Sequence, residues 1–192
     1  MYAEFAEKIA GLDAGVYVYP LAQTHITVLT AINFKSEIDP SQSRMSLIEE
    51  AAERLLAFLN SVATSLRPIV ITVGTPVLSG RAGYLPIQNP SGEIEWIRRA
   101  ALQFCRELGE PLARVQAPTI IHSTFLRFRR PPVDAEGFLY AFRRIAQEVV
   151  FGSATLDEIL VALETQPYMR EGRLMGRIRL KEPSSAVANP CA

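Results

Sequence analysis

Histidine is scarce in this chain of 192 residues, which contains only two copies of it. Lysine is almost as scarce, with three copies, and the formal net charge is zero. A protein that coats long nucleic acid by bulk electrostatics needs an excess of positive charge, so the composition argues against that class. It leaves open a small ligand or a chain end that carries phosphate.

Cysteines and long apolar runs are also few. Cys105 and Cys191 are too few for a disulfide framework, and a reduced, cytoplasmic setting is the simplest expectation. No run of about eighteen apolar residues exists, so we expect no membrane span. The first twelve residues carry Glu4, Glu7 and Lys8 in an amphipathic pattern, unlike the apolar core of a secretion signal.

Hydrophobic residues form 48% of the chain, enough for a packed core. Helical spacing of apolar residues predicts helices over 2–12, 43–63, 93–108 and 133–150. Apolar stretches bounded by turn residues predict strands over 15–19, 24–34, 69–78, 84–87, 119–129, 155–164 and 173–180. This mixture predicts an α+β fold. We expect residues 1–182 to form one domain and the Pro-, Ser- and Ala-rich residues 183–192 to form a flexible tail.

Both histidines open the same tetrapeptide, His25-Ile-Thr27-Val and His122-Ser-Thr124-Phe. Each motif lies in a predicted strand, where residues i and i+2 face the same side. The imidazole and the hydroxyl of each motif should therefore point the same way. Two such strands brought together give a pocket suited to a reaction at phosphorus. One imidazole takes a proton, the other gives one, and the hydroxyls hold the phosphoryl oxygens.

Strand alternation also predicts which neighbours share a face with each motif. In 24–34, His25, Thr27 and Leu29 are expected to face a cleft, and the core face is expected to carry Ile26, Val28, Ile32 and Phe34. In 119–129, strict alternation puts Arg127 on the face opposite His122, unless the strand is bulged.

The two motifs lie 97 residues apart and lead comparable blocks of strands and helices. Pro20 precedes the first motif as Pro118 precedes the second. This weak repeat predicts two similar lobes, each led by one motif, that face each other across a groove.

Other candidate site residues carry weaker signals. Tyr84 and Tyr168 are candidates for stacking a base, although plain packing also accounts for them. Arg81 lies in a predicted loop, where a cleft rim could use it. Arg129 and Arg130 precede two prolines, and solubilising a strand end is a sufficient role for them. Two histidines without further ligands at supporting spacing rarely make a zinc site, so no metal is expected.

On its two motifs the chain resembles the two-histidine (2H) phosphoesterase superfamily, which includes the bacterial RNA 2′,3′-cyclic phosphodiesterases first described as 2′-5′ RNA ligases. Two copies of His-x-Thr/Ser-hydrophobic at about this separation define that superfamily, and both copies are complete here. The second continues to Arg127 as His-Ser-Thr-Phe-Leu-Arg, and the order of elements is similar from about residue 15 to residue 180. The first motif lacks the glycine that often follows it in the ligase-like branch, which leaves the branch open.

The resemblance implies a bilobal, pseudo-symmetric α+β fold with antiparallel sheets lining a central cleft and helices outside. It implies a metal-independent phosphodiesterase, without a cofactor, that hydrolyses a 2′,3′-cyclic phosphate or a related 2′-5′ linkage of RNA ends or nucleotides. His25 and His122 would be general base and general acid, in an order that the sequence leaves open, and Thr27 and Thr124 would bind phosphoryl oxygens.

Two other functions remain open at the level of sequence. The same cleft could hold a phosphate or nucleotide without turnover, or the motifs could be chance features of a structural protein. The expected partner of the enzyme is a nucleotide or RNA terminus with a cyclic phosphate, with no membrane and no obligate protein partner.

Overall fold

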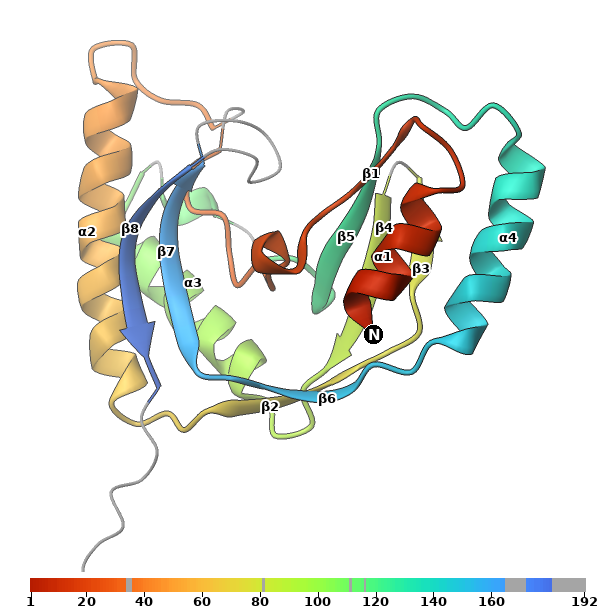
Figure 1. The fold of residues 1–192 in the computed structure, drawn as a ribbon. Helices are drawn as coiled ribbons and strands as arrows, with labels where there is room; N and C mark the ends of the chain where they lie inside the picture. The colour runs from red at the N-terminus through yellow and green to blue at the C-terminus, as the bar shows by residue number, and fades with distance from the viewer. Residues whose placement is uncertain (34–35, 81, 111, 116, 165–171, 181–192) are drawn as a thin grey trace, which may run out of the picture. The chain divides into compact units, whose positions relative to one another are not determined.

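The computed structural model describes residues 1–33, 36–80, 82–110, 112–115, 117–164 and 172–180 (Figure 1). Its α-helices are α1 (Tyr2–Ala10), α2 (Arg44–Ala63), α3 (Glu93–Leu108) and α4 (Ala135–Glu148), and two 3-10 turns are η1 (Leu21–Gln23) and η2 (Leu112–Arg114). Its strands are β1 (Val16–Val18), β2 (Ile69–Val73), β3 (Val77–Ser79), β4 (Ala82–Gln88), β5 (His122–Phe128), β6 (Gly152–Leu156), β7 (Glu158–Glu164) and β8 (Gly172–Arg179). The predicted α+β class is confirmed. Arg81, Tyr168 and the predicted tail, 183–192, lie outside the described residues.

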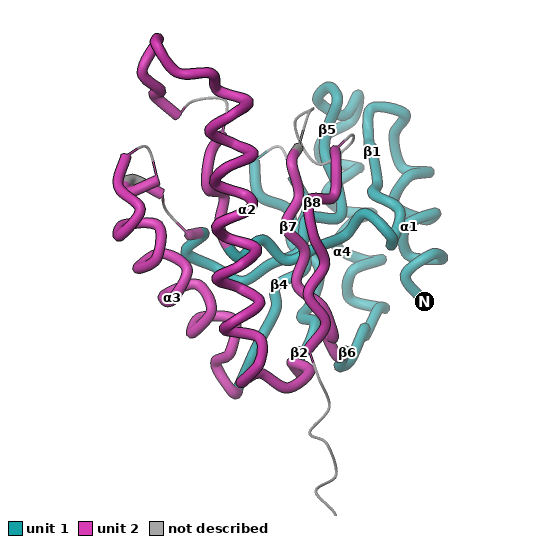
Figure 2. The backbone as a smooth tube through the Cα atoms, turned by 90° about the vertical axis from the view of Figure 1, so that its left-hand side faces the viewer, with its two compact units in different colours: residues 1–28, 71–90, 118–154 teal, residues 29–70, 91–117, 155–192 magenta. Residues whose placement is uncertain are grey.

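The chain divides into two compact units, each assembled from three stretches of sequence (Figure 2). Unit 1 comprises residues 1–28, 71–90 and 118–154, and unit 2 comprises 29–70, 91–117 and 155–192. Both His-x-Thr motifs belong to unit 1. The expectation that each motif leads its own lobe is therefore wrong, because the units interleave along the chain instead of following its two halves.

Unit 1 is built on an antiparallel sheet in which β5 is a central strand. The order is β1-β5-β4-β2-β6, with β3 also paired to β4, and the first two residues of β2 and the last two of β6 belong to unit 2. β1 lies along β5 with Val16 opposite Phe128. β4 lies along the other edge of β5, with Tyr84 opposite Thr124 and Pro86 opposite His122.

Helices α1 and α4 lie on one face of this sheet, which we call the helix-covered face (Figure 1). Aromatic rings join the layers there. The fully buried ring of Phe125 lies 5.2 Å from Phe5 of α1 and 6.3 Å from Phe142 of α4, and Phe128 lies 5.3 Å from Phe138. Burial of such rings is the main source of stability in a layer of this kind. The sheet face that carries His122 and Thr124 is the opposite one, the motif face.

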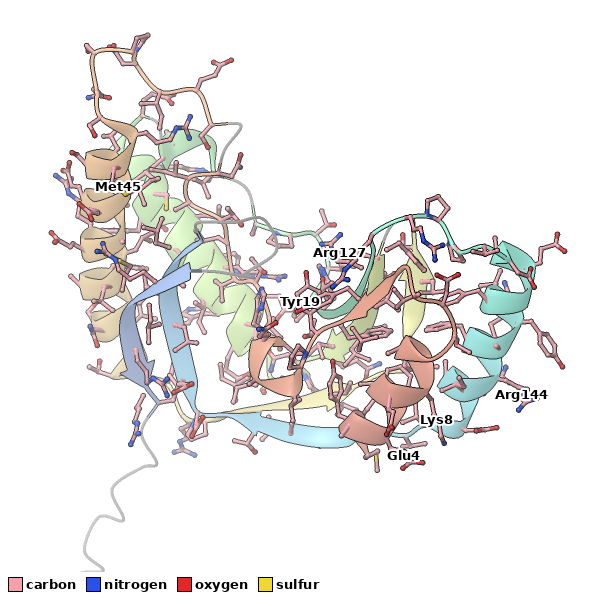
Figure 3. The ribbon with its side chains drawn as sticks, turned by 45° about the horizontal axis from the view of Figure 1, so that its top comes forward. Glu4, Lys8, Tyr19, Met45, Arg127 and Arg144 are labelled. Atoms are coloured by element: carbon pink, nitrogen blue, oxygen red, sulfur yellow. The ribbon has the colours of Figure 1, made fainter. Side chains whose placement is uncertain are left out.

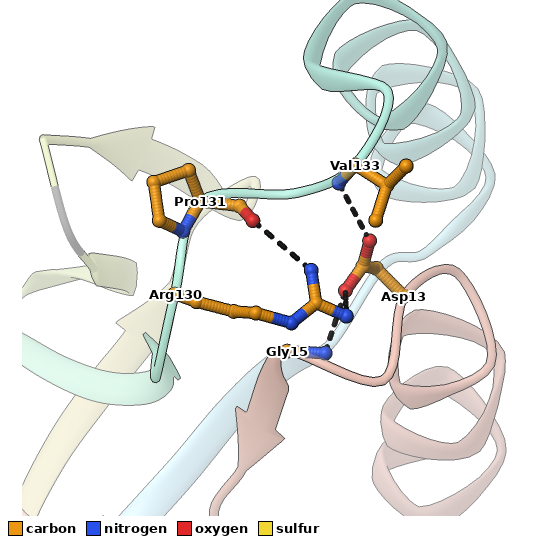
Figure 4. A network of polar contacts seen from close by, with 5 residues as sticks. All are labelled: Asp13, Gly15, Arg130, Pro131 and Val133. Atoms are coloured by element: carbon orange, nitrogen blue, oxygen red, sulfur yellow. Dashed lines mark hydrogen bonds and ion pairs between the residues drawn. The ribbon is translucent and has the colours of Figure 1, made fainter.

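A polar network fastens the loop after α1 to the loop after β5 (Figure 4). The carboxylate of Asp13 accepts hydrogen bonds from the backbone N–H groups of Gly15 (2.6 Å) and Val133 (2.9 Å). Arg130 lies 3.1 Å from the same carboxylate and also donates to the carbonyl of Pro131. A Cβ at Gly15 would lie 2.8 Å from Cγ of Arg130, so this close approach requires glycine.

Unit 2 contains α2, α3, η2 and the β7–β8 hairpin. Its hydrophobic core includes Ala51, Leu55, Cys105 and Leu112, and the rings of Phe58 and Phe104 stack at 4.4 Å. Ser43 caps α2, since its Oγ accepts from the backbone N–H of Ser46, and Gly109 ends α3 at φ +80°. No helix among the described residues combines the length and the apolarity that crossing a membrane requires.

Three strand predictions need correction. The region 69–78 is two strands, since β2 and β3 pair with different parts of β4. The described residues 24–33 form no strand, and Ile26 makes an isolated bridge. The expected core face of that segment is only half-buried at Ile26, Val28 and Ile32, and Phe34 lies outside the described residues. The region 155–164 is two strands, because β6 joins the sheet of unit 1 and β7 pairs with β8.

Candidate active site

One backbone contact brings the two His-x-Thr motifs together. Ile26 forms an antiparallel bridge with Ser123, the residue between His122 and Thr124. In this register His25 stands opposite Thr124, and Thr27 stands opposite His122. Directly opposite residues of an antiparallel pair have Cβ atoms about 4.5–5.5 Å apart and project to the same face. The two motifs are thus placed side by side within unit 1, each imidazole across from the other motif's hydroxyl.

The turn η1 makes this register possible. β1 and the first motif both run along the same edge of β5, at Val16 opposite Phe128 and at Ile26 opposite Ser123. The first segment advances ten residues while β5 advances five. The excess is taken up by Pro20 and the turn Leu21–Gln23, where Thr24 closes the turn through its hydroxyl on the carbonyl of Leu21 (2.7 Å).

His25 is exposed, and its ring is tied to the backbone of that turn. Its Nδ1 lies 3.0 Å from the carbonyl oxygen of Gln23. Because a carbonyl oxygen only accepts, Nδ1 carries the hydrogen in this contact, and the proton that exchanges with a ligand is the one at Nε2. A backbone anchor of this kind fixes ring orientation, and no pattern in the sequence indicates it, since any residue at position 23 supplies a carbonyl.

His122 is held differently. Its Nδ1 is buried, and no described residue hydrogen-bonds to that atom. Its ring instead packs against Tyr84, with centroids 5.5 Å apart at an interplanar angle of 69°. Tyr84 stands opposite Thr124 on β4, so its side chain lies on the motif face beside both residues. The tyrosine that the sequence suggested as a base-stacking group is thus an edge contact of the second imidazole.

A β-bulge at Phe125 reverses the prediction for Arg127. Tyr84 pairs with Thr124, but the next residue of β4, Gly83, pairs with Leu126, which leaves Phe125 as the extra residue of β5. Phe125 and Leu126 are both fully buried on the helix-covered face, where a Cβ at Gly83 would lie only 2.8 Å from Phe125 Cζ. Alternation resumes one residue out of phase.

As a result, Arg127 stands opposite Ala82, two residues from Tyr84 on an unbroken strand, and so lies on the motif face. Strict alternation would put Arg127 on the opposite face, and the bulge is the exception under which that prediction does not hold. The adjacent apolar pair Phe125-Leu126, in a strand that otherwise alternates, is the sequence signal that indicates such a bulge.

Two further candidate site residues, Arg81 and Tyr168, lie outside the described residues. Within the described residues, no three or more His, Cys, Asp or Glu side chains gather closely enough to hold a metal ion.

Comparisons with known proteins give a likeness of fold. No protein-family model matches the chain. No curated protein sequence matches it either. Among solved structures, that of TT0787 from Thermus thermophilus matches 94% of this chain and 92% of its own length, with a TM-score of 0.62 at 15% sequence identity. The chain therefore has an α+β fold similar to that of TT0787.

Proposed function

We propose that this protein is a metal-independent phosphodiesterase of the 2H type, with the bilobal fold of that superfamily, that hydrolyses 2′,3′-cyclic phosphates at RNA ends or on nucleotides. One observation carries the proposal. The bridge between Ile26 and Ser123 sets the two His-x-Thr motifs side by side, so that each histidine stands opposite the threonine of the other motif on one sheet face. We call this the crossed register, and it contains both histidines of the chain. Imidazole is the side chain best suited to exchange protons near neutral pH, and two in one site can serve as base and acid.

The reaction balances with these groups alone. One neutral imidazole takes a proton from water, and the water oxygen forms a bond to phosphorus. The bond from phosphorus to one ribose oxygen breaks, and the other imidazole, protonated, gives that oxygen its proton. The product is a ribose phosphomonoester with a free neighbouring hydroxyl. Each proton transfer is typically worth about 10²–10⁴-fold in rate.

Charge builds on the non-bridging oxygens of phosphorus in this step. Thr27 stands opposite His122 and Thr124 stands opposite His25 in the crossed register, and their hydroxyls would donate hydrogen bonds to these oxygens. Arg127 is a cation on the same strand and face, and its partner Ala82 lies two residues along β4 from Tyr84, the partner of Thr124. A guanidinium there would add charge-assisted hydrogen bonds, so the proposal counts Arg127 as a phosphate ligand.

A substrate panel tests the proposal. The protein is incubated, with chelator present, with 2′,3′-cyclic nucleotides, oligonucleotides ending in a cyclic phosphate and 2′-5′-linked dinucleotides. Turnover is expected for the wild type and is expected to be lost in both His25→Ala and His122→Ala. Ser123→Ala is the matched control, because it changes the same motif on the opposite face of the strand.

The alternative is a non-catalytic module that binds phosphate or a nucleotide in the same place. Binding without conversion of any member of the panel would establish that alternative and overturn the enzyme. Activity that chelator abolishes would point to a metal-dependent reaction instead.

A further inference from the structure

The motif face of β5 continues beyond the histidines as a row of polar side chains. After the bulge, Arg127 and Arg129 follow His122 and Thr124 on this face. Arg129 is the residue after β5, but its backbone N–H still donates to the carbonyl of Gly15 (2.8 Å), so the ladder with the β1 segment continues there. Successive members of this row are about 7 Å apart, because each step covers two residues of extended strand or of its β4 partner.

Arg129 is held in place by an aromatic ring. Its Cζ lies 5.0 Å from the ring centroid of Tyr17, which stands directly opposite Arg127 on β1. The hydroxyl of Tyr17 donates to Oε1 of Gln23 (3.3 Å), the residue whose carbonyl anchors His25. A guanidinium over a ring face loses little of its charge and keeps its N–H groups directed outward from the edge.

Arg129 also differs from Arg130 in its ion pairing. Arg130 is paired with Asp13, whereas Arg129 is exposed and forms no ion pair within the described part of the chain. Proteins that bind single-stranded nucleic acid use exposed cations to contact its phosphate backbone. Arg129 is an exposed cation that an aromatic ring fixes, in the same row as the proposed phosphoryl site.

We propose that Arg129, positioned by Tyr17, binds the phosphate on the 5′ side of the nucleotide whose cyclic phosphate lies at the two histidines. This rests on the proposed function and makes the substrate class a 5′-phosphorylated or oligonucleotide end, in preference to a free cyclic nucleoside phosphate. Arg127 lies between the two phosphates, and Arg129 lies one step further along the same row.

Three substrates isolate the contact: adenosine 2′,3′-cyclic phosphate, the same compound with a 5′-phosphate, and the dinucleotide that ends in that cyclic phosphate. We expect kcat/KM to be about tenfold higher for the two compounds with the additional phosphate, the gain of one modest charged contact. Arg129→Gln is expected to remove this preference. It should also reduce by about 1 the slope of log(kcat/KM) against log salt for the dinucleotide.

Two matched controls accompany that variant. Arg144→Gln makes the same change in charge on α4, where Figure 3 shows Arg144 projecting away from the sheet while Arg127 lies beside β5. Arg144→Gln should keep the preference. Tyr17→Phe, which retains the ring, should keep it as well, whereas Tyr17→Leu should lose it as Arg129→Gln does.

Equal kcat/KM for the three substrates in the wild type, or equal effects of Arg129→Gln and Arg144→Gln, would overturn the subsite while the phosphodiesterase stands. If no cyclic phosphate is converted, the phosphodiesterase fails, and binding decides the subsite. Adenosine 3′,5′-bisphosphate should then bind about tenfold more tightly than adenosine 3′-monophosphate to the wild type and equally to Arg129→Gln. Equal affinities in the wild type would overturn it.

Discussion

Ile26 and Ser123 pair across two segments almost a hundred residues apart, and this single bridge aligns His25 with Thr124 and Thr27 with His122. The contact sets the two short sequence motifs side by side, so that two imidazoles and two hydroxyls share one sheet face.

Loss of either motif threonine hydroxyl should slow the reaction. Thr124→Val and Thr27→Val remove hydroxyls from the motif face at nearly constant shape, and each should lower kcat by about 10²–10³-fold, as loss of one donor to a developing oxyanion does. Steady-state kinetics on a cyclic nucleotide measure this. Thr→Ser at the same positions should restore most of the rate, and a rate unaffected by either valine would contradict the role of the hydroxyls.

Substitution of Ser123 should stabilise the protein without loss of activity. The residue is 6% exposed, and its Oγ is buried with no hydrogen-bond partner among the described residues. Ser123→Ala removes that unsatisfied group, so the free energy of unfolding should rise by about 1 kcal/mol, with activity retained. Urea denaturation measures the change, and a clear loss of stability would show that the hydroxyl has a partner.

Tyr84 is expected to act through His122. Tyr84→Leu removes an aromatic contact worth about 0.5–1.5 kcal/mol and frees a ring that no described residue holds through Nδ1. Misplacement of a catalytic group by a fraction of an ångström should lower kcat by about tenfold or more with little effect on KM. Tyr84→Phe should remain near the wild-type rate. A rise in KM alone would instead support base stacking.

Substitution of Arg127 tests whether the bulge puts this side chain on the motif face. If it lies on the motif face, Arg127→Gln should lower kcat/KM by about 10- to 100-fold, the loss of a charge-assisted contact to phosphate, and Arg127→Lys should recover only part of it. An unchanged kcat/KM would place Arg127 away from the phosphate.

Stability at acid pH should depend on Asp13. The backbone N–H groups of Val133 and Gly15 and the nearby Arg130 hold the pKa of this carboxyl below its ordinary value. Since the pKa is lower in the folded state, the carboxylate contributes stability above its unfolded pKa, and this contribution is lost as the pH falls through the folded pKa.

Asp13→Asn should therefore unfold at lower urea concentration than the wild type at pH 7, and the difference should shrink as the buffer becomes acid. Glu136→Gln in the first turn of α4 is a control for loss of one surface carboxylate. A difference that stays constant with pH would mean that the carboxylate charge at Asp13 does not stabilise the fold.

The sequence predicted the helices to within a few residues and identified both motifs, because helical periodicity and tetrapeptide identity are local signals. It left the face of Arg127 dependent on whether the strand is bulged, and it extended the first motif into a long strand. The bulge at Phe125 depends on which residues of β4 lie opposite, and the turn at Leu21–Gln23 depends on how two segments share one edge of β5. The membership of both motifs in unit 1 is likewise a matter of tertiary pairing that no local pattern contains.

The central claim is that both imidazoles contact one phosphoryl group, and NMR titration of the two histidines tests it most directly. With only two histidines in the chain, the ring signals can be assigned through His25→Ala and His122→Ala. As a nucleoside 2′-phosphate is added, both rings should shift with the same dissociation constant. Shifts confined to one ring, or two rings that titrate with different constants, would contradict a shared site.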